Sequence, residues 1–391
     1  MPLLKYPKRV LVIRDKIFDI DDNITITEDL DKVPIEASFT IPFINEGALD
    51  TTNLHKYDAV KIYFKFYESA RARDIGTLDD MYLVFDGYIT TLENSENKSG
   101  GDEYNVKCVS TAGLMYERGT LVPTFTGTIP MICEQLLDQG NMINYFPNIN
   151  IEGFSQNFVA QVESNKFLGK VFDEMKEKYA MYIFQSGNGD LWITLPSWFG
   201  EQTEFKTYDL QQNVFDINYG EITQNVDTVV CFGAGNVFGV AFDPISYQLK
   251  LGTDPNNLQN TVQPERELMS ELYIYRRDLF GSEDCQRVAK EKLIELAKNY
   301  SLSFSTEFDP LQKVGDKLVI INSKKISPGQ KWIIKSREIT IQKSDISCNI
   351  TCYSNSIQDI PENMLSSAVL GLLDTDTYEI TEKIENEVNL H

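Results

Sequence analysis

Histidine, the commonest general base in enzymes, is nearly absent from this chain of 391 residues. The two histidines are His55 and the terminal His391. A Ser/His/Asp or Cys/His relay would have to run through His55 alone, and a zinc or iron site built on several histidines lacks its ligands. His55 stands in a polar stretch, residues 52–57, that leads into a predicted strand. We therefore interpret His55 as a surface loop residue and expect no catalytic residue of this kind.

Cysteine chemistry is equally weakly supported. The six cysteines are dispersed and none forms a CxxC pair: Cys108, Cys133, Cys231, Cys285, Cys348 and Cys352. Cys348 and Cys352 share one face of an alternating strand pattern, where their Cα atoms would be roughly 13 Å apart, too far for a disulfide. The sequence therefore predicts buried thiols rather than a disulfide scaffold.

Carboxylates and tryptophans leave a glycan-directed activity open as an alternative. Acidic pairs such as residues 21–22 and 79–80 could serve glycoside hydrolysis, and the tryptophans could line a sugar groove. A chain with 58 carboxylates contains such pairs by chance, and both pairs stand in polar loops. We interpret the pairs as solvated surface. Trp192 and Trp332 lie in predicted strands and are more simply core or interface aromatics.

One glycine-rich stretch, residues 233–239, superficially resembles a dinucleotide-binding loop. Its spacing is GxGxxxG, and residues 240–244 make a poor helix start. A phosphate site needs a helix N-terminus behind the loop. We therefore predict a turn here, and we expect neither a cofactor nor a metal.

The charge of the chain excludes further classes of protein. Lys and Arg number 36 against 58 Asp and Glu, which gives a formal net charge of -22. Nucleic-acid binders and proteins that bind anionic membranes need a basic face, which this balance argues against. No signal peptide is recognisable, and no apolar stretch approaches the length of a membrane span. We expect a soluble component without membrane contact.

The elements that must position any site are mostly strands. Alternating and β-branched segments fill residues 1–110, and strands return after residue 300. Between them, helical stripes run over residues 129–137 and 167–179, followed by a hairpin around the glycine turn at 187–189. Residues 206–280 are strand-like at first and loop-rich over 236–275, and a helix is predicted from Ser282 to Asn299. The fold class is therefore mainly β with an α+β insert.

Three short matches recur in the same order in the two β segments. Residues 38–40 (Ser-Phe-Thr) match 303–305 (Ser-Phe-Ser), residues 57–62 match 315–320, and residues 104–110 match 348–354. Each match alone is at chance level, but their collinear order predicts two related β domains. A trimer of such chains would present six similar domains around its axis. It could therefore join a sixfold ring to a threefold object.

Taken together, this order of elements resembles the baseplate hub proteins of contractile phage tails and related contractile injection systems. The resemblance covers about residues 30–355 and includes the strand at 84–89, the insert, the hairpin at 181–194, the helix at 282–299 and the motif at 314–316. It implies a homotrimeric ring of two β-barrel-like domains per chain, with the tail tube protein above and a separate central spike protein below. Gly87 inside a strand would then be a bulge or a close backbone contact.

With this resemblance the domain plan is as follows: residues 1–110 form the first β-barrel domain, 111–205 the α+β insert domain, 206–280 a connecting region, 281–360 a helix with the second β-barrel domain, and 361–391 an acidic amphipathic tail. The tail has a net charge of -6, leaving -16 on the presumed ring body. Its apolar residues recur at helical spacing, and we expect five of them to dock onto a partner or a neighbouring subunit: Leu365, Val369, Leu372, Ile380 and Ile384.

The sequence therefore predicts a non-enzymatic virion structural protein. It would act as the hub of a tail baseplate, assembled in the host bacterial cytoplasm and in contact with other baseplate proteins. DNA would pass transiently through its channel, and acidic walls would discourage sticking. The alternatives are an extracellular carbohydrate-active β protein, either a glycan hydrolase or a glycan-binding protein, and a tail-tip protein of a non-contractile phage with the same fold.

Overall fold

The computed structural model describes residues 6–18, 23–42, 53–67, 77–96, 102–117, 119–154, 159–162, 165–202, 204–221, 226, 228–242, 271–296, 298, 300–326, 329–342 and 346–354. The chain divides into two compact units. The larger unit comprises Met1–Gly220 and Ser301–Ser354, and the smaller unit comprises Glu221–Tyr300 and Asn355–His391.

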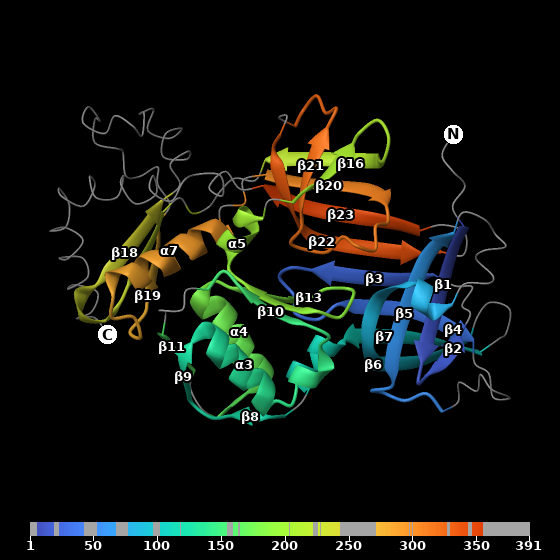
Figure 1. The fold of residues 1–391 in the computed structure, drawn as a ribbon, viewed down its shortest axis with the longest axis horizontal. Helices are drawn as coiled ribbons and strands as arrows, with labels where there is room; N and C mark the ends of the chain where they lie inside the picture. Colours follow the sequence, from blue (N-terminus) through green and yellow to red (C-terminus); the bar gives the residue numbers. More distant parts are fainter. Residues whose placement is uncertain are drawn as a thin grey trace. The chain divides into compact units, whose positions relative to one another are not determined.

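A 13-stranded sheet dominates the larger unit (Figure 1). Its N-terminal strands are β1 (Tyr6–Ile13), β2 (Lys16–Phe18), β3 (Ile24–Asp29), β4 (Glu36–Pro42), β5 (Ala59–Tyr67), β6 (Tyr82–Glu96) and β7 (Asp102–Ser110). Its later strands are β15 (Lys206–Asp209), β16 (Val214–Glu221), β20 (Tyr300–Glu307), β21 (Lys317–Ile321), β22 (Lys331–Ile341) and β23 (Ile346–Ser354). The expectation of a mainly β protein is therefore confirmed.

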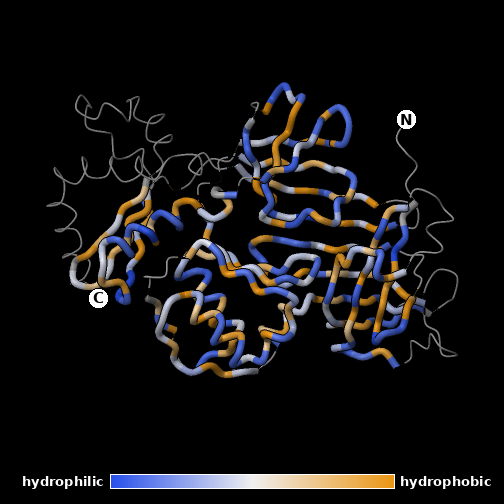
Figure 2. Tube along the Cα trace, viewed as in Figure 1, coloured by the Kyte–Doolittle hydropathy of each residue, from blue (hydrophilic) through white to orange (hydrophobic). Residues whose placement is uncertain are grey.

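Period-two patterning explains why these segments are strands. In β3, Ile24 and Ile26 are fully buried, and the alternating Thr25 and Thr27 are half-buried. In β23, Ile346, Cys348, Ile350 and Cys352 all face the core. Figure 2 shows apolar and polar residues alternating along many of the strands. In strands with this pattern, one face is buried and the other is more exposed to solvent. All six cysteines are buried free thiols, as the sequence predicted.

The same strand order occurs twice in this sheet. The neighbours in the first strand set are β3-β4-β7-β6-β5, and those in the second strand set are β16-β20-β23-β22-β21. The three sequence matches fall on corresponding strands, namely β4 and β20, β5 and β21, and β7 and β23. The collinear matches in the sequence therefore correspond to a repeated arrangement of strands.

A β-bulge lies at the same place in both strand sets. In the first, the register between β6 and β7 shifts between Ile89 and Thr91, next to Cys108. In the second, the register between β22 and β23 shifts between Ile334 and Ser336, next to Cys352. Cys108 and Cys352 are the corresponding residues of the sequence match. A bulge increases local twist and bends its strand, so both sets bend at the same point.

The turn that leads into β5 is repeated before β21. Asp58 accepts a hydrogen bond from the backbone N–H of His55 at 2.8 Å, and Asp316 accepts one from that of Lys313 at 2.9 Å. The residue before each aspartate has a positive φ, +74° at Tyr57 and +86° at Gly315. The N–H of each then donates to a carbonyl oxygen just before the bulge, on Ile89 and Ile334, at 2.8 Å in both cases. The aspartate carboxylate fixes this turn by satisfying a loop N–H.

Gly87 lies where β6 passes close to β7. A Cβ atom on Gly87 would lie 2.1 Å from the carbonyl oxygen of Val109 and 2.7 Å from the Cα of Ser110. No side chain fits at such distances, so the glycine permits the close approach of two backbones. The close backbone contact expected from the sequence is confirmed.

The insert between the strand sets packs helices against short strands. The helices are α2 (Leu114–Glu117), α3 (Ile129–Gln139), α4 (Leu168–Tyr179) and α5 (Pro196–Glu201). The strands are β8 (Leu121–Val122), β9 (Phe125–Thr128), β10 (Ile149–Glu152), β11 (Val159–Val162), β12 (Lys166–Phe167), β13 (Tyr182–Gln185) and β14 (Leu191–Thr194). Thr128 caps α3 by accepting a hydrogen bond from Met131. The predicted apolar stripes of α3 and α4 are buried, except for Phe167, which precedes α4 and is 54% exposed.

In the smaller unit one helix covers a three-stranded sheet. The sheet has the order β18 (Phe238–Phe242), β17 (Thr228–Phe232), β19 (Glu271–Tyr275), and α7 (Ser282–Leu296) packs against β17 and β18. Residues 233–237 form the turn between β17 and β18, as predicted. The expectation of a loop-rich region over residues 236–275 was incomplete, because β18 and β19 lie within it.

Candidate functional site at the junction of the two strand sets

The two strand sets are joined through one long strand, β22. Its first residues, Lys331–Ile333, pair with β21, and after the bulge residues 336–341 pair antiparallel with β3. Leu30 extends this contact by donating its N–H to the carbonyl oxygen of Lys335 at 2.8 Å. Figure 1 shows β22 and β3 side by side in the middle of the sheet. The bulge therefore marks where β22 changes partner.

A buried ion pair crosses this junction. Arg337 and Glu28 are opposite each other in the β22–β3 register. The guanidinium donates from Nε to Glu28 Oε2 at 2.8 Å and from Nη2 to Oε1 at 3.0 Å. The exposed fractions of the two side chains are 3% and 0%. Burial alone would lower the pKa of Arg337, but the facing carboxylate outweighs burial and raises it. The bidentate geometry makes the pairing specific for this register.

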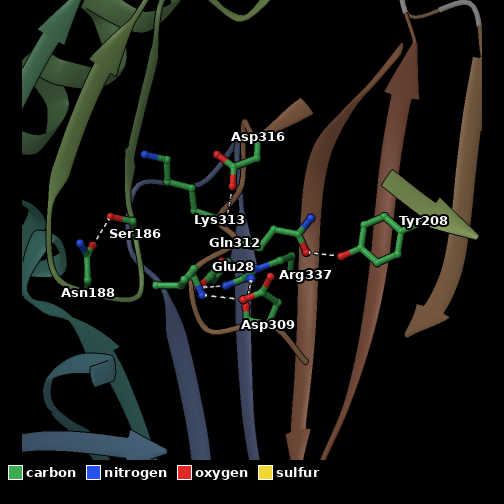
Figure 3. Close-up of polar contacts among 10 residues, drawn as sticks. Glu28, Ser186, Asn188, Tyr208, Asp309, Gln312, Lys313, Asp316 and Arg337 are labelled. Carbon is green, nitrogen blue, oxygen red and sulfur yellow. Dashed lines mark hydrogen bonds and ion pairs between the residues drawn. The ribbon is translucent and has the colours of Figure 1, made fainter. Parts of the chain in front are cut away.

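The turn of the insert hairpin closes over the ion pair. A Cβ atom on Gly187 would lie 3.1 Å from Glu28 Oε1 and 2.8 Å from the carbonyl oxygen of Val84. Ser186 and Asn188 flank this glycine, and the Ser186 hydroxyl donates to Asn188 Oδ1 at 2.6 Å (Figure 3). The glycine turn that the sequence predicted at 187–189 therefore lies against the junction. Its lack of a side chain lets the turn approach Glu28 closely.

A second layer of polar groups surrounds Arg337 (Figure 3). Arg337 also donates from Nη1 to the carbonyl oxygen of Asp309 at 3.2 Å, and the Asp309 carboxylate is paired with Lys206. Burial alone would raise the pKa of Asp309, but the hydrogen bonds from Lys206 and from the backbone N–H of Leu311, together with the charges of Lys206 and Arg337, outweigh burial and lower it. Tyr208 donates its hydroxyl to Gln312 Oε1 at 2.7 Å. These contacts connect strand β15 and the loop before β21 to the junction.

A cleft of about 560 Å³ opens beside these residues. Its lining includes Trp192 and Trp198, whose ring centroids are 5.5 Å apart, and Phe184 behind them. Lys313 Nζ lies 3.6 Å from the centroid of the Trp192 ring. Burial lowers the pKa of Lys313 and raises the pKa of Asp316. The cleft combines aromatic surface with charges that are engaged in turns and ion pairs.

The structure places the residues singled out from the sequence in different environments. His55 is exposed in its loop, as predicted, and Trp332 is fully buried in the core. Trp192 lines the cleft. The candidate partner-binding residues Leu365, Val369, Leu372, Ile380 and Ile384 lie outside the residues that the structure describes.

Sequence reasoning missed the Glu28–Arg337 pair. Each residue continues the buried face of an apolar alternation, after Ile24 and Ile26 in one strand and before Ile339 and Ile341 in the other. A charged residue at a position where the period-two pattern predicts a buried apolar residue was the signal that could have revealed the pair. Buried charges of this kind need a partner.

Two searches for other kinds of site found nothing within the described part of the chain. Among the residues described, no group of three or more His, Cys, Asp or Glu side chains could hold a metal ion. None of the helices described is both long and apolar enough to cross a membrane.

Solved structures of tail proteins share this fold, although no protein-family model and no curated protein sequence matches the chain. The tail protein from Neisseria meningitidis MC58 matches 90% of this chain and 98% of its own, with a TM-score of 0.62 and 11% identity. The 43 kDa tail protein of prophage MuSo2 from Shewanella oneidensis matches 90% and 99%, with a TM-score of 0.59 and 13% identity.

A secretion-system protein has the same fold. The match is an E. coli component of the type VI secretion system, described as structurally similar to the T4 bacteriophage tail proteins gp27 and gp5. It covers 89% of this chain and 77% of the other, with a TM-score of 0.52 and 12% identity. The resemblance inferred from the sequence is therefore confirmed at the level of the fold: this chain has the fold of phage tail proteins and of that type VI secretion component.

Proposed function

We propose that this protein is the structural hub of a phage tail baseplate or of a related injection machine. Three copies form a ring that joins the sixfold tail tube to the threefold central spike and surrounds a channel. The observation that carries this proposal is the repeated strand set, with its strand order, bulge and aspartate turn. Three chains with two such sets each offer six similar surfaces to one partner and three to the other.

The partners follow from this geometry. The tail tube protein would bind the face that repeats six times, and the spike protein and other baseplate proteins would bind faces that repeat three times. The fold shared with the Neisseria and Shewanella tail proteins supports a place in the virion. The protein would be assembled in the host bacterial cytoplasm. Part of the net charge of -16 outside the tail would line the channel and keep DNA in passage from adhering to its wall.

The domain plan and the tail keep their roles in this proposal. Residues 1–110 and 281–360 would each supply a barrel-like domain, with the insert at 111–205 and the connecting region at 206–280 between them. Strands β15 and β16 of the connecting region would complete the second barrel-like domain. The apolar face of the tail, Leu365 to Ile384, would dock onto the spike or onto a neighbouring subunit. Replacing Leu365, Val369 and Leu372 together by aspartate should then weaken spike binding or reduce the mass of the assembly. An effect on neither would exclude this docking.

A glycan-directed function would have to use the cleft beside the junction. Lys313 lies over one face of the Trp192 ring, so that face is not open to a sugar ring. The Asp309 carboxylate is paired with Lys206, and the Asp316 carboxylate accepts a hydrogen bond from the backbone N–H of Lys313 in the turn before β21. These contacts favour the structural role. Turnover of cell-wall or capsular glycan that is abolished by replacing one cleft carboxylate would overturn this ranking.

The test of the hub is the state of assembly. Light scattering on the purified protein should give three times the chain mass of 44.6 kDa, and electron microscopy should show a threefold ring. The same measurements with the spike and tube proteins should show a stack with the ring between them. A monomer in all of these conditions would contradict the proposal.

A further inference from the structure

Several strand edges in the larger unit have no strand partner among the described residues, and two of them belong to the repeated strand sets. One is the edge of β16 that faces away from β20, because β16 ends the described strand order. The other is the edge of β6 beyond its bulge, because β5 pairs only with Tyr82–Tyr88 of β6 while β7 covers the opposite edge as far as Glu96. Open edges of this kind are templates for pairing with another chain.

These two edges correspond through the repeat to the two strands of the junction. The order of the strand sets matches β16 to β3, and the shared bulge matches residues 91–96 of β6 to residues 336–341 of β22. Each strand set therefore contains one strand equivalent to β3 and one equivalent to β22. Within the chain, β3 of the first set pairs with residues 336–341 of β22 of the second set. The equivalent pairing of β16 with residues 91–96 of β6 is not made within the described part of the chain.

Residues of β6 near its open edge are more exposed than the corresponding residues of β22, which lie at the junction. Arg337 and Ile339 of β22 are buried under the junction. Their counterparts in β6 are Leu92, which is half-buried, and Asn94, which is exposed. Leu92 occupies in β6 the position that Arg337 occupies in β22. A leucine suits this position, because a cation there would have no counter-charge until a second chain bound.

We propose that β16 of one copy adds antiparallel to residues 91–96 of β6 in the next copy, and that this contact repeats between chains the junction that β3 and β22 make within a chain. The inference rests on the proposed trimer and names its subunit contact. The contact uses different edges on the two copies, so it is heterologous and generates a ring when the rotation closes. Three copies then contain six junctions, alternately within and between chains.

A different pairing is available and has to be distinguished. The described strand order ends at β2 on its other side, so β16 could instead pair end to end with β2 of another copy. That pairing would continue the sheet without repeating the junction. Ile17 of β2 is 53% exposed and serves as the reporter for it.

Engineered disulfides test the contact in the full chain. The six native cysteines are buried, so exposed substitutions dominate cross-linking. Asn218→Cys in β16 is combined in turn with Glu93→Cys, Asn94→Cys and Ser95→Cys in β6, because the equivalent register places this part of β6 opposite Asn218. We expect at least one pair to give a covalent trimer on a non-reducing gel, reversed by reductant. Asn218→Cys alone should give none.

The control pair combines Asn218→Cys with Ile17→Cys, and light scattering measures the mass of every variant. A trimer by mass that cross-links through β2, or through none of the β6 positions, overturns the β16–β6 contact and leaves the proposed hub standing. A monomer by mass with every partner present overturns the hub itself. Co-expression of Asn218→Cys with the successful single β6 variant should give a species of two chains, which shows that the bond joins different copies.

Discussion

Arg337 and Glu28 form the contact on which the sheet junction depends at the scale of single residues. Both charges are removed from water, and each compensates the other through two hydrogen bonds. Such a pair adds little net stability compared with apolar residues of the same size, whereas loss of one partner leaves a buried charge uncompensated. The pair therefore acts mainly to fix the register of β22 against β3.

Glu28→Gln should lower the free energy of unfolding by about 3–5 kcal/mol, because Arg337 is left buried without a counter-charge. Urea unfolding followed by circular dichroism measures the change. The matched control is Glu36→Gln, whose partner Lys32 is 53% exposed while Glu36 itself is 55% exposed, and which should cost less than about 1 kcal/mol. Replacing both Glu28 and Arg337 by methionine should recover most of the loss. Equal costs for Glu28→Gln and Glu36→Gln would refute this role of the pair.

Asp309 makes stability depend on pH. Burial alone would raise its pKa, but the contacts with Lys206, the Leu311 N–H and Arg337 together outweigh burial, so the pKa is lowered in the folded protein. A carboxylate with a lowered pKa adds stability above its unfolded pKa, and this contribution is lost as the pH falls through the folded value. The difference in unfolding free energy between wild type and Asp309→Asn should therefore be largest near pH ~7 and shrink toward pH ~3. A difference that stays constant over this range would contradict the ion pair.

Repeated turns organise the molecule at the scale of elements. The aspartate turn before β5 and before β21 places a residue of positive φ next to the bulge in both strand sets. At one site this residue is Tyr57, which is 52% exposed. At the other it is Gly315, because a Cβ there would lie 2.6 Å from Cε1 of the buried Phe199. The same backbone thus accepts different residues according to the packing around it.

Gly315→Ala should cost more than backbone strain alone. Gly329 has a similar φ of +81° with no atom within 4 Å of an added Cβ, so Gly329→Ala reports the strain by itself. We expect about 1–2 kcal/mol for Gly329→Ala and at least about 1 kcal/mol more for Gly315→Ala because of the clash with Phe199. Thermal and urea unfolding of both variants measure the difference. Equal losses would show that Phe199 moves aside without cost.

Charge governs assembly at the scale of the whole molecule. Each copy carries -22, so copies repel one another at low ionic strength. Added salt shortens the Debye length from about 30 Å at 0.01 M to about 8 Å at 0.15 M, which weakens this repulsion. Added salt should therefore strengthen the proposed trimer. Sedimentation equilibrium should show that the trimer persists to lower protein concentrations at high salt than at low salt. A trimer that falls apart as salt rises would instead be held by surface ion pairs.

Sequence by itself determined the local features of this protein. Alternation in β3 and β23, the stripes and the Thr128 cap of the insert helices, the glycine turn at 187–189 and the collinear matches could all be predicted. These features depend on residues a few positions apart, whose spacing fixes the side of a strand or helix on which they lie. Composition also excluded histidine-based chemistry.

Only the tertiary structure decided how the two strand sets meet. Glu28 and Arg337 are 309 residues apart, and nothing local distinguishes their pairing from other charge pairs in a chain with 36 basic and 58 acidic residues. The cleft likewise brings Trp192 next to Lys313, on segments far apart in sequence. Strands β18 and β19, within residues 236–275, also escaped prediction, although most of their residues are of types that strands favour; both pair with β17, which lies outside that range. Such contacts depend on register between distant strands, which no local spacing encodes.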